Sequence, residues 1–291
     1  MNNIIENIVL AGGGFYGYAQ AAALNALFDS NITIHLKNIC GVSAGSMIAA
    51  LIAVGYAPSE VLEILENIDF NSLIKDNQLP YINLVKKFGM YDAILLHKYI
   101  EKLIYRKTGI RKCTFSQLEI NLTIVATDLN YQCPCYFNKN TDPDMPISKA
   151  VRMSISYPII ISPMVHNGTL YGDGGNTVNF PFSIYDDAEK TIGITFSTID
   201  ENADGSLKRP HNISNLVDYV RSIGQTLSRT AYIAQASSNI SRYIVIDIDV
   251  EIDSMQFNLN ENQINSLYNC GVNAVDNFLK MQFNHQIMSR L

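Results

Sequence analysis

The residues best suited to chemistry are a serine and the two glycines that flank it. Gly41, Ser43 and Gly45 form a G-x-S-x-G pattern between an apolar run and a segment with helical spacing. A serine at such a strand-to-helix turn is held in a strained conformation, and its hydroxyl projects at the carboxyl edge of a sheet. The pattern therefore predicts that Ser43 is a nucleophile.

A glycine-rich turn precedes this serine and admits more than one interpretation. Gly12, Gly14 and Gly17 match the G-x-G-x-x-G pattern of dinucleotide-binding sites. Such a site also needs an acidic residue about 20 positions later, where this sequence brings a serine. Alternatively, the amides of Gly12, Gly13 and Gly14 form an oxyanion hole. We favour the oxyanion hole over a dinucleotide site and over a turn that serves only packing, because it places an anion site beside Ser43.

Ser43 requires a base, for which the sequence offers histidine or aspartate. None of the histidines occurs in a context that marks a catalytic residue: His35, His97, His166, His211 and His285. Asp173 is better placed, because Gly172, Gly174 and Gly175 surround it after a short apolar strand. A carboxylate shielded from water accepts a serine proton directly when it lies within hydrogen-bond reach. An ordinary Asp-Gly turn explains the same residues.

These side chains meet only if parallel strands end at a common edge. The sequence predicts strand, glycine turn and helix over residues 8–28, then strand, serine turn and helix over residues 32–54. This succession is typical of a right-handed βαβ unit. Further strands are expected at residues 121–126, 132–137, 170–171, 191–195 and 243–247, and further helices at residues 97–105, 147–153, 213–238 and 261–283.

Three segments have a less certain place in this scheme. Residues 71–112 form a helical insertion, either a lid or membrane-facing cap or, as we favour, an amphipathic packing layer. The basic residues from Lys98 to Lys112 either bind anionic lipid or form a solvated helix face. Pro163 limits residues 159–165 to an edge strand. The helix at residues 213–238 has an apolar side made by Leu216, Val217, Val220, Ile223 and Leu227.

The composition favours one globular domain over residues 1–291. The chain is 47% hydrophobic and 16% charged, so it can bury a large core. A formal charge of −6 argues against a nucleic-acid partner. The only linker candidate is a polar loop at residues 200–210.

The same composition bears on redox state and location. The five cysteines have neither redox nor zinc-binding spacing, so we expect reduced thiols. The sequence shows no secretory signal and no apolar run long enough to span a bilayer. We therefore expect a cytoplasmic-type location.

Taken in order, the motifs resemble those of the patatin-like phospholipases. The blocks that carry the resemblance are Gly12-Gly-Gly-x-x-Gly17, Gly41-x-Ser43-x-Gly45 and Asp173-Gly-Gly175, with Ser154-x-Ser156-x-Pro158 and residues 126–129 in support. The resemblance covers about residues 8–181, and residues 191–291 are expected to complete the same domain. One departure is Tyr16, because the family usually carries Arg or Lys at this position.

The resemblance implies a three-layer α/β/α sandwich with a mainly parallel sheet, related to cytosolic phospholipase A2. Ser43 would attack a lipid acyl ester, Asp173 would act as general base without histidine, and the amides of Gly12, Gly13 and Gly14 would stabilise the oxyanion. The implied activity is phospholipase A-type hydrolysis of phospholipid or another acyl lipid at a membrane surface, without metal or organic cofactor. An acyltransferase or transacylase that uses the same acyl-serine is the alternative, ahead of a non-catalytic module.

Overall fold

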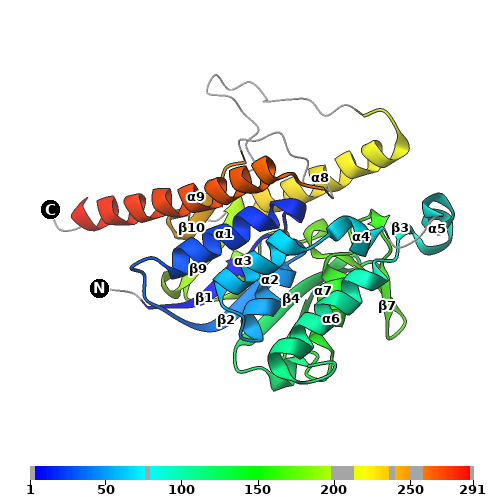
Figure 1. Ribbon diagram of the computed structural model, residues 1–291, viewed down its shortest axis with the longest axis horizontal. Helices are drawn as coiled ribbons and strands as arrows, with labels where there is room; N and C mark the ends of the chain where they lie inside the picture. Colours follow the sequence, from blue (N-terminus) through cyan, green and yellow to red (C-terminus); the bar gives the residue numbers. More distant parts are fainter. Residues whose placement is uncertain (1–3, 76–78, 198–212, 236–239, 249–257, 289–291) are drawn as a thin grey trace.

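A mainly parallel sheet runs through the centre of the protein (Figure 1). The computed structural model describes residues 4–75, 79–197, 213–235, 240–248 and 258–288. The strand order is β10-β9-β1-β2-β4-β8-β7, and β5 also pairs with β4. The pairs from β10 to β4 are parallel, whereas β4–β5, β4–β8 and β7–β8 are antiparallel. These strands are β1 (Ile5–Leu10), β2 (Ile34–Val42), β4 (Asn121–Asp128), β5 (Cys133–Phe137), β7 (Met164–His166), β8 (Thr169–Asp173), β9 (Thr191–Phe196) and β10 (Tyr243–Ile246).

Both faces of the sheet are covered. The helices are α1 (Gly17–Phe28), α2 (Ala44–Ala53), α3 (Pro58–Asn67), α4 (Phe70–Ile74), α5 (Pro80–Lys87), α6 (Ile94–Thr108), α7 (Ile147–Ser154), α8 (Leu216–Gln235) and α9 (Glu261–Met288). Because successive strand residues point to opposite faces, Ile8 joins the large core with α1, α2 and α9, whereas Val9 joins a smaller core with Phe180 and Phe182. The arrangement is the expected three-layer α/β/α sandwich.

The C-terminal part adds to the same sheet and helical layer. Strands β9 and β10 extend the sheet beside β1, and α9 packs along α1 (Figure 1). One domain over residues 1–291 stays a prediction that this continuity supports. The polar loop expected at residues 200–210 lies outside the described residues. Within the described part of the chain, no helix combines the length and apolar character needed to cross a bilayer.

A second, two-stranded sheet attaches the insertion to the rest of the molecule. Strand β3 (Gly89–Tyr91) pairs in parallel with β6 (Ile159–Ile161). Helix α6 buries Leu96, Ile100 and Leu103 and packs against α4 and α7, so it is a packing layer. Helix α5 has no buried residue and projects at the right-hand end of Figure 1.

Candidate active site

Ser43 occupies the sharp turn between β2 and α2. Its φ of 50° and ψ of −121° belong to a region that residues other than glycine seldom adopt, at a cost of about 1–3 kcal/mol. A Cβ atom at Gly41 would lie 2.3 Å from the carbonyl oxygen of Gly45, and one at Gly45 would lie 2.6 Å from the carbonyl oxygen of Ala11. Both flanking glycines are therefore required by the close approach of backbone.

Two buried serines hold this turn. The backbone N–H of Ser43 donates to Oγ of Ser154 over 2.8 Å, and the Ser154 hydroxyl donates to the carbonyl oxygen of Val125. On the other side of the turn, the carbonyl oxygen of Ser43 accepts from the Ser46 amide over 2.9 Å and from the Ser46 hydroxyl over 2.6 Å. The Ser154 block, whose role the sequence did not reveal, thus positions the nucleophile.

We expect Ser154→Ala to lower the free energy of unfolding by about 1–3 kcal/mol, because it leaves the Ser43 amide without its acceptor. Ser46→Ala is the matched control, since the Ser43 carbonyl then keeps its bond to the Ser46 amide, and its loss should be smaller. Urea denaturation followed by circular dichroism measures both losses. Equal stability of Ser154→Ala and the wild type would contradict this role.

Strand β4 brings Asp173 to Ser43. Val42, the last residue of β2, is paired with Val125, and Asp173, the last residue of β8, is paired with Ala126. Strand β5 pairs with Val125 and Ala126 along the opposite edge of β4. Strands β2 and β8 therefore share one edge of β4 and meet end to end, which joins residues 130 positions apart.

Asp173 is fixed through each of its polar groups. The hydroxyl of Ser43 donates to its Oδ2 over 2.7 Å, and the amide of Gly175 donates to its Oδ1 over 2.8 Å. The backbone N–H of Asp173 donates to the carbonyl oxygen of Ser156, and its own carbonyl oxygen accepts from the hydroxyl of Thr127. The side chain is only 3% exposed. This geometry is that of a nucleophile beside a base.

Burial sets the charge state of Asp173. It raises the pKa of the carboxyl group from 3.8 to about 6, against the lowering effect of the hydrogen bonds from Ser43 and Gly175. The cause is the loss of hydration, which disfavours the charged form. At neutral pH the group is a carboxylate with a pKa close to the ambient pH, which suits a general base.

The glycine turn lies beside this pair. A Cβ atom at Gly12 would lie 3.2 Å from the Cβ atom of Ser43. The Gly12 amide donates to the carbonyl oxygen of Asn179 over 3.1 Å. Within the described part of the chain, no hydrogen bond engages the amides of Gly13 and Gly14. Of the three predicted oxyanion residues, these two have amides available for an anion, and Gly12 supports them.

Asn179 is a residue of the site that the sequence reasoning missed. Its Nδ2 donates to the carbonyl oxygen of Gly12 over 3.1 Å. Its Oδ1 would lie 2.4 Å from a Cβ atom at Gly12 and 2.7 Å from one at Gly175, so the side chain touches both glycine corners. The only available signal was an asparagine in an Asn-Phe-Pro turn shortly after Gly175.

Aromatic rings replace the cation that the family usually carries next to the glycine turn. The ring of Tyr16 packs against Phe196, with 5.8 Å between their centroids. The Phe196 ring lies directly over Gly13, where it would clash with any Cβ atom. Aromatic rings therefore line the side of the glycine turn at Gly13.

Two of the described histidines, His97 and His166, make contacts elsewhere, and His35 is exposed on β2. The Nε2 atom of His97 lies 3.3 Å from Oγ of Ser148, and Nδ1 of His166 lies 2.8 Å from Nζ of Lys149. His211 and the side chain of His285 fall outside the described residues. Among the described side chains, the hydroxyl of Ser43 finds its partner in Asp173.

Several known proteins are similar to this chain in sequence. A family model described as patatin-like phospholipase matches residues 8–186. An uncharacterized protein of Acanthamoeba polyphaga mimivirus is 49% identical over 97% of this chain and 96% of its own. A "probable lipid hydrolase" of Invertebrate iridescent virus 6 is 30% identical over 62% of each chain. An omega-hydroxyceramide transacylase of Mus musculus is 26% identical over 68% of this chain and 31% of its own.

Solved structures share the fold. VipD from Legionella pneumophila superposes with a TM-score of 0.61 over 97% of this chain and 67% of that chain, at 16% sequence identity. The type III effector ExoU superposes with a TM-score of 0.54 over 95% of this chain and 53% of that chain, also at 16% identity. The chain thus spans about half to two thirds of these structures, and at this identity the likeness concerns the fold alone.

Proposed function

The chain belongs to the patatin-like phospholipase family, and from this premise we propose that it is a phospholipase A-type serine hydrolase of lipid acyl esters. The observation that carries the proposal is the hydrogen bond from Ser43 to Asp173 at a strained turn that lies against Gly12 of the glycine turn. The relative named a probable lipid hydrolase supports an acyl lipid as the substrate.

The acylation step follows from the geometry of the pair. Oγ of Ser43 attacks the ester carbonyl carbon, while Oδ2 of Asp173 takes the hydroxyl proton across the 2.7 Å hydrogen bond. The carbonyl oxygen becomes an oxyanion that the amides of Gly13 and Gly14 stabilise, by about 2.7–4 kcal/mol per donor in comparable sites. Collapse of this intermediate breaks the ester bond, and Asp173 returns the proton to the leaving alcohol.

Deacylation repeats the same steps with water. Asp173 accepts a proton from a water molecule that attacks the acyl-Ser43 carbonyl, and the second oxyanion occupies the same site. When the intermediate collapses, the proton returns to Oγ of Ser43 and the fatty acid leaves. One carboxylate thus serves both halves of the reaction, and Gly175 holds it in place by its bond to Oδ1.

We expect hydrolysis of a water-soluble ester to fall as the pH is lowered through about 6. Asp173 acts as a base only as a carboxylate, and burial raises its pKa to about 6. Below this pH, the value of kcat/KM should fall about tenfold per pH unit, because one proton blocks the base. The pH–rate profile with p-nitrophenyl butyrate measures this. A profile that stays flat down to the ordinary aspartate pKa of 3.8 would contradict the assignment.

A transacylase is the second candidate function, and it is favoured by one observation. The relative from Mus musculus is named an omega-hydroxyceramide transacylase. Its reaction class needs the same acyl-serine, which an alcohol acceptor would attack in place of water. Lipid-product mass spectrometry, with and without an alcohol acceptor, separates free fatty acid from a new ester. The same experiment with Ser43→Ala tests the proposed function itself.

A further inference from the structure

Helix α5 and the residues beside it expose a group of apolar side chains. Its side chains, with the residues that flank it, form what we call the α5 surface: Leu79, Tyr81, Ile82, Val85 and Phe88. Tyr81 is 74% exposed and Val85 is 79% exposed. Ile94 and Leu95, at the start of α6, are exposed as well. A contiguous exposed run of this kind marks an interaction site, because single exposed apolar residues are ordinary but clusters are not.

The α5 surface is connected to the candidate active site through strands β3 and β6. Strand β3 follows α5 and pairs with β6. Strand β6 in turn follows the segment in which Ser154 accepts from the Ser43 amide and the Ser156 carbonyl oxygen accepts from the Asp173 amide. This strand pair and the Ser154–Ser156 segment therefore link the α5 surface to Ser43 and Asp173.

Helix α8 borders the same corner with a second apolar stripe. Leu216, Tyr219, Ile223 and Leu227 are all exposed, and their spacing puts them on one side of the helix. The helix contacts β6 and the turn at Gly174–Asn176, and Gly224 lies against Tyr157. Of the apolar side that the sequence predicted for this helix, Leu216, Ile223 and Leu227 thus face outward, next to the aspartate corner.

The charges around these surfaces favour an anionic partner. Lys86 and Lys98 are exposed, whereas the acid of this segment, Asp92, is paired with Lys87 over 2.5 Å. Residues 79–98 thus hold three lysines, Lys86, Lys87 and Lys98, against this one acid, on a chain whose formal charge is −6. Basic residues beside exposed apolar ones are typical of segments that bind anionic lipid.

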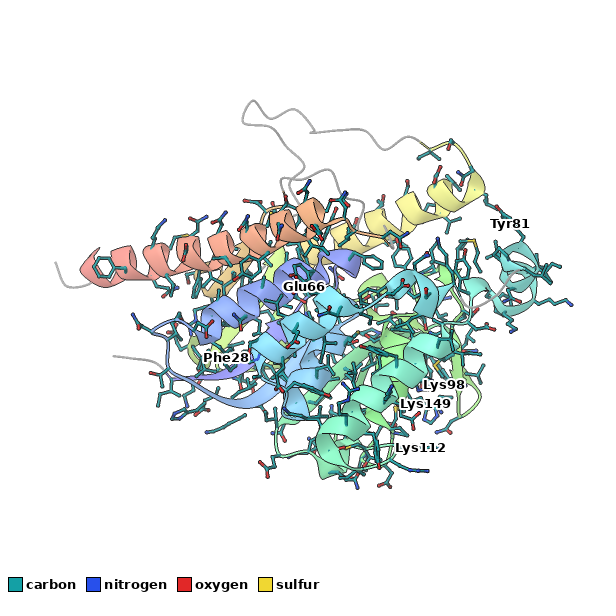
Figure 2. The ribbon with its side chains drawn as sticks, in the orientation of Figure 1. Phe28, Glu66, Tyr81, Lys98, Lys112 and Lys149 are labelled. Carbon is teal, nitrogen blue, oxygen red and sulfur yellow. The ribbon has the colours of Figure 1, made fainter. Side chains whose placement is uncertain are left out.

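The shape favours a membrane as the occupant. Helix α5 projects from the molecule, and Tyr81 lies on this projection in Figure 2, with Lys98 on α6. A projecting helix of 8 residues suits insertion into the fluid headgroup layer, because a stable protein interface needs about 800 Å² on each partner. We propose that the α5 surface and the α8 stripe dock the protein on anionic phospholipid membranes, with the Ser43 site beside the bilayer. This proposal rests on the proposed function, since the substrate is then supplied by the same membrane.

Two matched double variants test the docking. Tyr81→Glu with Val85→Glu places two charges on the α5 surface. Met281→Glu with Phe283→Glu places the same charges on α9, whose side chains there are 56% and 65% exposed. The C-terminal end of α9 lies at the opposite end of the molecule from α5 (Figure 1). Flotation with mixed phosphatidylcholine–phosphatidylglycerol vesicles measures binding, in a Ser43→Ala background so that the lipid stays intact.

We expect the α5 variant to bind these vesicles at least about tenfold more weakly than the α9 variant, because two apolar contacts are lost. With Ser43 present, hydrolysis of vesicle lipid should fall in parallel, while hydrolysis of p-nitrophenyl butyrate stays unchanged. Salt should weaken the binding of the parent protein.

Equal flotation of the two variants would overturn the docking proposal. A second result would also overturn it: the parent protein is a dimer, the α5 variant is a monomer, and the two float equally. The α5 surface would then join two copies of the chain. Light scattering after size exclusion measures this. A parent protein that hydrolyses neither substrate would contradict the proposed function. The docking proposal would still be tested by flotation, because vesicle binding is measured in the Ser43→Ala background.

Discussion

Ser43→Ala is expected to reduce hydrolysis of vesicle phospholipid on the order of a millionfold, the loss seen when other serine hydrolases lose their nucleophile. The substitution removes the oxygen atom that forms the acyl-enzyme, and a water molecule beside Asp173 cannot form that covalent intermediate. The fold should persist, because the amide of Ser43 keeps its bond to Ser154 and its carbonyl keeps those from Ser46. Lipid-product mass spectrometry of the wild type and the variant, run in parallel, measures the loss.

Ser148→Ala is the control for this experiment. Ser148 is a buried serine on α7, the same helix as Ser154, but its hydroxyl lies against His97 and away from Ser43. It should keep most of the activity and should still be labelled by a fluorophosphonate probe, whereas Ser43→Ala should not be labelled. Full activity in Ser43→Ala would end the proposal of a serine hydrolase.

The sequence predicted those parts of the site whose residue types are required by neighbouring residues in the chain. The turn at Ser43 needs glycine at positions 41 and 45, because a Cβ atom at either position would lie within 3 Å of backbone atoms, and this requirement leaves a pattern around Ser43 that the sequence shows. The parallel pairing of β1 and β2 likewise follows from two strand–helix units in succession. Asp173 had no such local signal, and only the family blocks singled it out from an ordinary turn.

The remaining features depend on pairings between distant parts of the chain. Asp173 reaches Ser43 because β2 and β8 meet end to end on β4, and a single sequence does not specify that register. The Gly12 amide donates to the carbonyl oxygen of Asn179, and the Asn179 side chain donates back to the carbonyl oxygen of Gly12, across 167 positions, so this engagement was equally hidden. Periodicity also identified an apolar side on α8 without indicating what that side faces. The sequence predicted amphipathic elements, and the tertiary structure decided which apolar faces were buried.

Asp173→Asn is expected to reduce hydrolysis about 10⁴-fold or more while making the protein more stable. The amide cannot accept the serine proton, so activity falls. The neutral side chain can still accept from Gly175 through Oδ1 and can donate to Oγ of Ser43, so the local structure is kept. The change also removes a buried charge. A rise of the aspartate pKa from 3.8 to about 6 corresponds to a destabilisation of about 3 kcal/mol at neutral pH.

The sign of this effect separates a catalytic carboxylate from a structural one. The native state holds the proton of Asp173 more tightly than the unfolded state, so its ionisation lowers stability as the pH rises from about 4 to about 6. Urea denaturation should therefore find Asp173→Asn more stable by about 2–3 kcal/mol at pH 7. Below pH 3.8 both side chains are neutral, and the two stabilities should converge. A structural carboxylate, held for the bonds it accepts, would give the opposite result at pH 7, since its replacement would weaken the fold. A less stable Asp173→Asn would thus contradict the view that this buried charge is maintained for catalysis at the expense of the fold.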